Sequence, residues 1–185
     1  MSGFRLDGDP YVFVAVGTDH HPFPRLMDWV RGWADVRPEP RLLVQSGNTP
    51  PPPNVDSRDY LDYDDVMETM RRSLGVVCHG GPATIIEVRR CGLMPIVVPR
   101  RAGLGEHVND HQWLFSRRLA EEGEVRLCET QTEWTEAMVE LIESPDSYRV
   151  DDIGDDHVAE AVETFALLVE PYILRSQERS RRRRR

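Results

Sequence analysis

The sequence predicts an α/β protein with a Rossmann-like parallel sheet that is covered by helices on both faces. Short apolar runs typical of buried strands alternate with segments of helical periodicity along most of the 185 residues. Two of these runs lead directly into glycine turns, at Gly17 and at Gly80-Gly81. Because strands separated by helices pair in parallel through right-handed crossovers, one sheet and one hydrophobic core are expected.

Six strands are predicted from short apolar runs that are bounded by turn residues. They are Tyr11–Val16, Arg41–Gln45, a short strand near Asp59–Leu61, Gly75–Cys78, Met94–Pro99 and Val125–Cys128. The second and third strands are separated by a stiff loop that contains four consecutive prolines, Pro50 to Pro53.

Six helices are predicted from apolar residues that recur three and four positions apart. They are Pro24–Trp33, a segment with Val66 to Leu74, Pro82–Cys91, a helix opening at His107–Gln112, Gln131–Ile142 and one from His157 to about Ser176. Pro82 suits a first helical turn, and Gly92 is a natural residue to end that helix.

The chain is expected to contain one domain with two short extensions. Residues 1–10 form an N-terminal extension, 11–176 form the domain, and 177–185 form a disordered arginine-rich tail. The last predicted helix carries an apolar stripe, which either covers the sheet or helps to dock a second protein.

Composition is that of a globular protein, with 39% hydrophobic and 30% charged residues. No apolar stretch approaches the roughly 18 residues that span a bilayer, and the N-terminus lacks the apolar core of a signal peptide. Cys78, Cys91 and Cys128 form no CxxC pair, so a disulfide framework is not expected. These features predict a cytoplasmic location.

Charge is distributed unevenly, and every one of the 23 basic residues is an arginine. Up to Leu174, 16 arginines face 31 acidic residues, which gives −15; from Arg175 on, seven arginines face Glu178, which gives +6. Arg181 to Arg185 are expected either to be a solvated tail or to assist binding at an anionic membrane surface. No nucleic-acid partner is expected, since the acidic body would repel a duplex and no aromatic residues are interleaved with the arginines.

The segment after Cys78 has the residues of an anion-binding turn. Gly80 and Gly81 allow a ligand to approach the backbone, and the start of the next helix presents the N–H groups of Ala83 and Thr84 to a phosphate. Glu87 lies about one turn further along, where its carboxylate could accept two hydroxyl protons from a ribose. The alternative is an ordinary strand-to-helix turn.

Polar residues also follow two other predicted strands, at Gly17-Thr18 and at Arg100 to Gln112. Ligands of open α/β sheets bind at the carboxyl ends of the strands, so these segments belong to the same candidate site. Arg100 either adds positive charge near a diphosphate or is a solvated loop residue.

Four blocks of sequence resemble the donor-binding half of the GT-B glycosyltransferases, in particular the small separate subunits of two-part enzymes. The blocks are Val16-Gly17-Thr18 with Pro22-Phe23, His79 to Ala83, Pro95 to Arg100, and Gly105 to Gln112. The similar subunits include the catalytic subunit of the dolichol-linked N-acetylglucosaminyltransferase and bacterial exopolysaccharide glycosyltransferase subunits. The resemblance covers residues 11 to about 130.

This resemblance implies the C-terminal domain of the glycosyltransferase 28 family and a UDP-sugar donor that needs no metal or other cofactor. It implies phosphate contacts at Gly17, Thr18, Gly80, Gly81, Ala83, Thr84 and Arg100, ribose binding by Glu87, and sugar binding by Asp110, His111 and Gln112. It further implies transfer with inversion to a lipid-linked acceptor, which a membrane-anchored partner subunit holds at the cytoplasmic face of the membrane.

The general base is expected to be His20 or His21, which follow the first glycine turn, or else to come from the partner. Surface histidines with no catalytic role are the alternative. His107 and His111 have the i, i+4 spacing of a zinc pair, but no third ligand is evident and Val108 stands where a metalloprotease has glutamate. Asp62-Tyr63-Asp64 resembles a metal-binding Asp-x-Asp motif, yet its place before a helix favours N-capping.

Two other functions remain open beside catalysis. A non-catalytic regulatory subunit would retain the donor pocket, and a nucleotide-sugar epimerase would share the fold. A dinucleotide dehydrogenase is not expected, because no GxGxxG follows the first strand.

Overall fold

In the computed structural model, residues 4, 6 and 8–150 are described, and they contain a six-stranded sheet in the order β3-β2-β1-β4-β5-β6. Every neighbouring pair of strands is parallel. The strands are β1 (Tyr11–Ala15), β2 (Arg41–Gln45), β3 (Asp56–Arg58), β4 (Gly75–Cys78), β5 (Ile96–Val97) and β6 (Arg126–Leu127). The predicted parallel α/β sheet is thereby confirmed.

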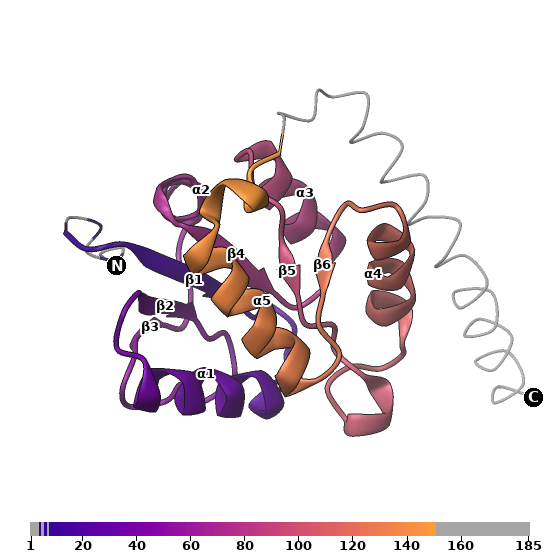
Figure 1. Cartoon of the computed structure of the whole chain (residues 1–185). Coiled ribbons are helices and arrows are strands. Elements are labelled where there is room, and N and C mark those ends of the chain that lie inside the picture. Colours follow the sequence, from indigo (N-terminus) through magenta and orange to yellow (C-terminus); the bar gives the residue numbers. More distant parts are fainter. Residues whose placement is uncertain (1–3, 5, 7, 151–185) are drawn as a thin grey trace, which may run out of the picture.

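Helices cover both faces of this sheet (Figure 1). The helices are α1 (Pro24–Val36), α2 (Tyr63–Arg72), α3 (Pro82–Arg90), α4 (His111–Glu121) and α5 (Gln131–Glu143), with 3₁₀ turns η1 (Ala102–Leu104) and η2 (Pro145–Tyr148). On one face, α1 and α5 pack against Val12 and Val14 of β1. On the other face, α2 and α3 pack against Tyr11 and Phe13 of the same strand.

The alternation of side chains along β1 explains why both faces need a helical cover. Successive strand residues point to opposite faces, and all five residues of β1 are buried. A central parallel strand therefore appears in the sequence as an uninterrupted apolar run. This pattern is what made β1, β2 and β4 predictable.

The predicted strand near Asp59–Leu61 was misplaced. The third strand is β3, Asp56–Arg58, whose residues pair with Leu43, Val44 and Gln45 of β2. It is a short edge strand of polar residues, so its position is set by pairing with β2 and not by an apolar signal. Tyr60 and Leu61 therefore lie beyond the carboxyl end of the strand.

The predicted start of the fourth helix at His107 was also wrong, since α4 begins at His111. Gly105 has a left-handed φ of 72°, which ends the preceding 3₁₀ turn. The Asn109 side chain then accepts a hydrogen bond from the backbone N–H of His111. These local interactions hold residues 105–110 outside the helix despite the helical spacing of the histidines.

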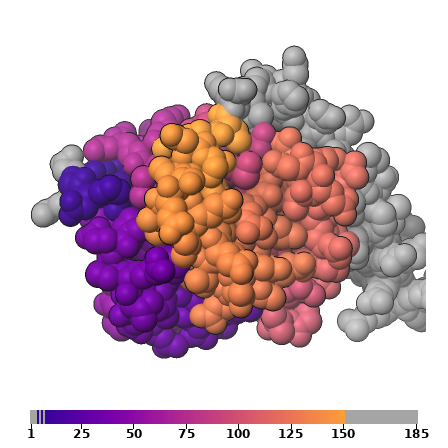
Figure 2. Space-filling view, in the orientation of Figure 1, coloured from indigo at the N-terminus to yellow at the C-terminus, as the bar shows by residue number. Residues whose placement is uncertain are grey.

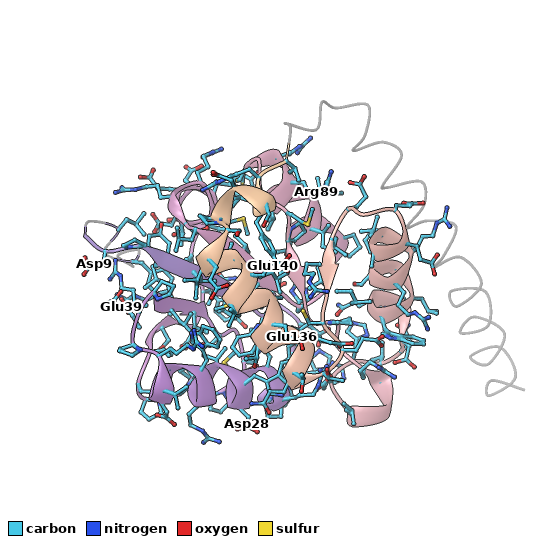
Figure 3. The ribbon with its side chains drawn as sticks, viewed as in Figure 1. Asp9, Asp28, Glu39, Arg89, Glu136 and Glu140 are labelled. Atoms are coloured by element: carbon cyan, nitrogen blue, oxygen red, sulfur yellow. The ribbon has the colours of Figure 1, made fainter. Side chains whose placement is uncertain are left out.

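The helix α5 begins with a capping box in which Thr130 and Glu133 bond each other's backbone N–H groups. Its buried face joins the core, and Figure 2 shows its residues lying across one side of the molecule. Its outer face carries exposed carboxylates such as Glu136 and Glu140, which are labelled in Figure 3. The Tyr148 hydroxyl of η2 contacts Glu140 at 3.0 Å and fixes the end of the described chain against α5.

Several predictions of local structure are confirmed. Asp62 caps α2 by accepting the backbone N–H of Asp65, and Gly92 adopts φ 71° after α3. Cys78 and Cys128 are buried, and all three cysteines are free thiols. The predicted helix from His157 and the tail of arginines lie outside the described residues. Within the described part of the chain, no helix is long and apolar enough to cross a membrane.

Candidate functional site

A cleft of about 420 Å³ opens at the carboxyl ends of β1 and β4. These strands are neighbours in the sheet, and the strand order reverses between them, since β2 and β3 extend to one side and β5 and β6 to the other. Such a switch point is where open parallel sheets bind ligands. Its volume is within the range of small-molecule sites.

One wall of the cleft is the first turn of α3. Gly81 is the N-cap residue and has no side chain to bond the free backbone N–H groups, and Pro82 begins the helix. Ala83 and Thr84 follow and also line the cleft. The turn therefore presents amide donors and the positive end of a helix dipole to the space where an anion would lie.

The His79 imidazole lies between the two glycine turns, at Gly17 and at Gly81. A Cβ built on Gly17 would be 2.4 Å from His79 Cε1, and one built on Gly81 would be 2.4 Å from His79 Nε2. Gly17 also has a φ of 80°, which side chains rarely adopt. The ring is thus fixed by two positions that only glycine can occupy.

The same imidazole is held in its neutral form. Burial, together with the charge of Arg100, lowers the pKa of His79 to about 4, although its contact with the backbone oxygen of Ala15 works in the opposite direction. His79 Nδ1 lies 3.4 Å from that oxygen. His79 lines the cleft, yet the sequence prediction did not include it among the site residues. Its place directly before the glycines was the available signal.

Glu87 lies in the cleft one turn after Thr84. Partial burial raises the pKa of Glu87, and the charge of Arg90 opposes this effect. It is the only charged side chain that lines the cleft in the described part of the chain. No cationic side chain among the described residues lines the cleft beside this carboxylate, so its oxygens can accept hydrogen bonds from the hydroxyl groups of a ligand.

The opposite wall of the cleft was not predicted from the sequence. It is formed by Tyr60 and Leu61, which follow β3, together with three residues of α2, namely Tyr63, Val66 and Met70. Gln45 at the end of β2 fixes this wall, since its side-chain oxygen accepts the backbone N–H of Leu61 at 3.2 Å. The wall is apolar and aromatic, which suits a flat heterocycle.

The loop after β1 leaves the cleft at Gly17 and Thr18 and continues into Asp19, His20 and His21. Asp19 Oδ1 accepts the backbone N–H of His21 at 2.7 Å and lies 2.6 Å from its Nδ1. Burial alone would raise the pKa of Asp19, but these two bonds together with the charges of His107 and His21 hold the pKa below its ordinary value. The structure thereby separates the two candidate bases: His20 is largely exposed, while His21 is oriented by a carboxylate.

The loop before α4 approaches this carboxylate from the other side. His107 Nε2 lies 3.6 Å from Asp19 Oδ2, and the ring centroids of His107 and His111 are 4.6 Å apart. Burial lowers the pKa of both imidazoles. Residues separated by more than 80 positions in the sequence therefore form one cluster, which we call the histidine cluster: Asp19, His20, His21, His107 and His111.

The remaining residues predicted to bind the sugar lie around the start of α4. Asp110 Oδ1 accepts the backbone N–H of Ala102 at 2.8 Å and thus helps to fix the preceding turn. Gln112 is buried, and its Oε1 has no hydrogen-bond partner among the described residues. Buried polar atoms normally have a hydrogen-bond partner, so this oxygen is an exception, although Gln112 does not line the cleft. The contacts of these residues with a sugar remain predictions.

Arg100, the predicted phosphate ligand, is not the exposed loop residue considered as its alternative. It is fully buried, and its guanidinium donates to the carbonyl oxygens of Val16, His21 and Glu106. Nε has no hydrogen-bond partner among the described residues, and Arg100 does not line the cleft, so its predicted contact with phosphate remains a prediction. Gly80, with φ 87°, lies against Ser116 and Pro99, while the other predicted phosphate-binding residues line the cleft.

Within residues 8–150, the group of side chains that could hold a metal ion is part of the histidine cluster. One donor atom each from Asp19, His20 and His21 lies within 4.8 Å of the others. The i, i+4 argument for His107 and His111 no longer holds, because His107 precedes the helix. The three candidate ligands are consecutive in one loop, and the bond between Asp19 and His21 already accounts for their closest contact.

Comparison with known proteins supports the fold described above. The sequence profile described as the glycosyltransferase family 28 C-terminal domain matches residues 11–162. A search of curated proteins gave no sequence match. Among solved structures, the glycosyltransferase of kitacinnamycin is 18% identical with a TM-score of 0.57, over 92% of this chain and 44% of that one.

Two further structures show the same fold at different lengths. MurG of Acinetobacter baumannii is 15% identical with a TM-score of 0.54, over 86% of this chain and 46% of that one. ALG13, solved by NMR, is 15% identical with a TM-score of 0.53, over 88% of this chain and 96% of that one. The chain thus spans less than half of the first two proteins and nearly all of the third.

Proposed function

This chain belongs to the glycosyltransferase family 28 C-terminal domain family, and from that premise we propose that it is the donor-binding, catalytic subunit of a two-part transferase. The donor is a UDP-sugar, which binds in the cleft between β1 and β4. The observation that carries this proposal is the meeting of the uncapped start of α3 and the lone carboxylate of Glu87 in one cleft.

The three parts of a uridine nucleotide correspond to three parts of the cleft. The diphosphate lies at the first turn of α3, where Ala83 and Thr84 offer amide hydrogens. The ribose hydroxyls donate to Glu87. The uracil ring lies against the wall formed by Tyr60, Leu61 and Tyr63.

The sugar extends from the diphosphate toward the histidine cluster and Gln112. The acceptor hydroxyl attacks the anomeric carbon from the face opposite the diphosphate, the bond to UDP breaks, and the configuration inverts. His21 takes the acceptor proton at Nε2, since Asp19 engages its Nδ1. The amides of α3 stabilise the departing diphosphate, so no metal ion is required.

The acceptor is proposed to be lipid-linked and held by a separate membrane-anchored subunit. The support is the resemblance to the separate subunits of two-part enzymes, together with the fold shared with ALG13. Leu104 and Val108 are 62% and 71% exposed on the loop before α4, beside the histidine cluster. Apolar side chains at that position suit a partner surface at the cytoplasmic face of a membrane.

The test is the melting temperature of the full chain with UDP, several UDP-sugars, GDP and NAD. A ligand that binds only the folded state raises the melting temperature. We expect a rise with UDP or one UDP-sugar that is lost in Glu87→Ala. Glu121→Ala, an exposed substitution on α4, is the matched control and should retain the rise.

A rise with GDP or NAD of the same size as with UDP would contradict the assignment of uridine. A rise with UDP that persists in Glu87→Ala would place the nucleotide elsewhere. If the chain alone gives no rise, the same titration with the co-expressed partner decides whether the cleft needs the second subunit.

A further inference from the structure

Arg100 is a charged side chain that the fold buries completely beside the site. Its relative exposure is 0%, and its guanidinium lies over the ring of Phe23 at 4.8 Å from the centroid. Burying a cation costs several kcal/mol unless hydrogen bonds and counter-charges compensate it. The partners of this residue therefore indicate what the fold gains from placing it there.

Those partners are three backbone oxygens from separate segments. Nη2 donates to Val16 at the end of β1, at 2.8 Å. Nη1 donates to His21 at 2.7 Å and to Glu106 at 3.0 Å. One guanidinium thus joins β1, the loop that carries Asp19 and His21, and the loop that leads to His107.

The charge of Arg100 is balanced by carboxylates of the same two loops. Burial lowers the pKa of Arg100, whereas the charges of Asp19 and Glu106 oppose that effect. Glu106 is itself held by Arg25, with Nε–Oε1 and Nη2–Oε2 distances of 2.9 Å. The two loops are therefore fixed to the protein body by ionic as well as hydrogen-bonding contacts.

We propose that Arg100 is a positioning residue, which sets the loop of Asp19 and His21 against the loop of His107 and thereby creates the Asp19–His21 hydrogen bond. This inference rests on the proposed function, in which His21 is the base. It also replaces the predicted contact of Arg100 with phosphate by an indirect role. Only arginine fits this role, because the three oxygens are reached by two different nitrogens of a planar group.

The experiment uses the full chain labelled with ¹⁵N-histidine, in the variants Arg100→Lys and Arg100→Gln. Arg101→Lys and Arg101→Gln are the matched controls, since the Arg101 side chain contacts Glu129 and Trp113 instead. The readout is the Nδ1–H resonance of His21, which is assigned by its loss in His21→Gln. A proton hydrogen-bonded to a carboxylate gives a strongly downfield signal.

We expect this signal in the unsubstituted protein and in both Arg101 variants, and its loss in both Arg100 variants. Cooperative melting shows that each variant is folded, so that the loss is local. Retention of the signal in folded Arg100→Lys and Arg100→Gln overturns the proposal. So does its absence from the unsubstituted protein, or a failure of Arg100→Lys to fold, because Arg100 would then be a general requirement of the fold.

The UDP titration is run on the same samples and is read separately. No UDP-induced rise in melting temperature in any sample counts against the nucleotide site and leaves the histidine spectra to decide the role of Arg100. A rise that persists in Arg100→Lys, together with loss of the His21 signal, supports both proposals. Arg100 then acts on the base and not on the bound phosphate.

Discussion

The imidazole of His79 occupies the space that a side chain on Gly17 would need, since an added Cβ would lie 2.4 Å from His79 Cε1. Gly17 lies two residues beyond the end of β1 and His79 directly follows β4, so this contact joins the two turns that leave these neighbouring strands at the cleft. An added Cβ on Gly81 would also lie too close to the ring, 2.4 Å from His79 Nε2. The position of the His79 ring in the cleft therefore depends on glycine at both turns.

We predict that Gly17→Ala destabilises the protein by about 3 kcal/mol, the sum of left-handed strain and overpacking. Gly105→Ala is the matched control, because Gly105 has a similar φ of 72° but nothing within 4 Å of an added Cβ. It should cost only about 1 kcal/mol. Urea unfolding measures both, and equal losses would contradict the role of His79.

The neutral state of His79 predicts a dependence of stability on pH. The pKa of His79 is lowered from 6.5 to about 4 in the folded protein, so the unfolded chain binds more protons between these values. The contribution of neutral His79 to the free energy of unfolding is complete above pH 6.5. As the pH falls toward 4, this contribution is lost, by about 3 kcal/mol in total.

Substituting His79→Asn should remove this part of the pH dependence. The measurement is the difference in unfolding free energy between wild type and variant at pH 7, 5 and 4, with exposed His20→Asn as the control. A difference that stays constant from pH 7 to 4 would show that His79 is not buried in its neutral form.

Local sequence signals identified those parts of the fold and site that depend on neighbouring residues. Continuous apolar runs predicted β1, β2 and β4, and the glycines beside Pro82 predicted the turn into α3. By contrast, β3 is a polar edge strand whose place is decided by pairing with β2, so a window of sequence contains no signal for it.

The parts of the site that were not predicted are contacts between segments that lie far apart in the sequence. The burial of Arg100 depends on oxygens supplied by Val16 and His21, which are about 80 residues away. The approach of His107 to Asp19 depends on how two loops meet. Such contacts follow from tertiary packing and leave no periodic pattern in the sequence.

The ion pair of Arg25 with Glu106 predicts a large loss of stability when one partner is removed. The Glu106 side chain is 3% exposed and that of Arg25 is 19% exposed. Glu106→Gln should cost about 3 kcal/mol, since it removes a buried carboxylate charge that faces both Arg25 and the fully buried Arg100. The surface pair of Arg118 with Glu122 is the comparison, and Glu122→Gln should cost at most about 0.5 kcal/mol. Chemical denaturation measures the free energy of unfolding of both variants, and equal losses would contradict this prediction.

The orientation of His21 predicts that the two adjacent histidines differ in catalysis. His21→Ala should lower the transfer rate by about 10²-fold to 10⁴-fold, the usual contribution of a general base. His20→Ala should have a small effect, because His20 is 79% exposed and its Nδ1 lies 4.0 Å from Asp19. The measurement is the release of UDP by the chain in complex with the proposed membrane-anchored subunit. Equal rates for both variants would assign the base to the partner.

The last prediction concerns metal ions at the histidine cluster. Asp19, His20 and His21 can bring one donor atom each within 4.8 Å of the others, which is close enough for a common ion. The proposed chemistry does not use such an ion. In that proposal, the diphosphate lies in the cleft and is stabilised by backbone amides at the start of α3. We therefore expect the UDP-induced rise in melting temperature and the release of UDP to be unchanged in EDTA. If EDTA abolishes transfer, zinc or manganese restores it and Asp19→Asn prevents the restoration, then Asp19 holds a catalytic metal and does not orient His21.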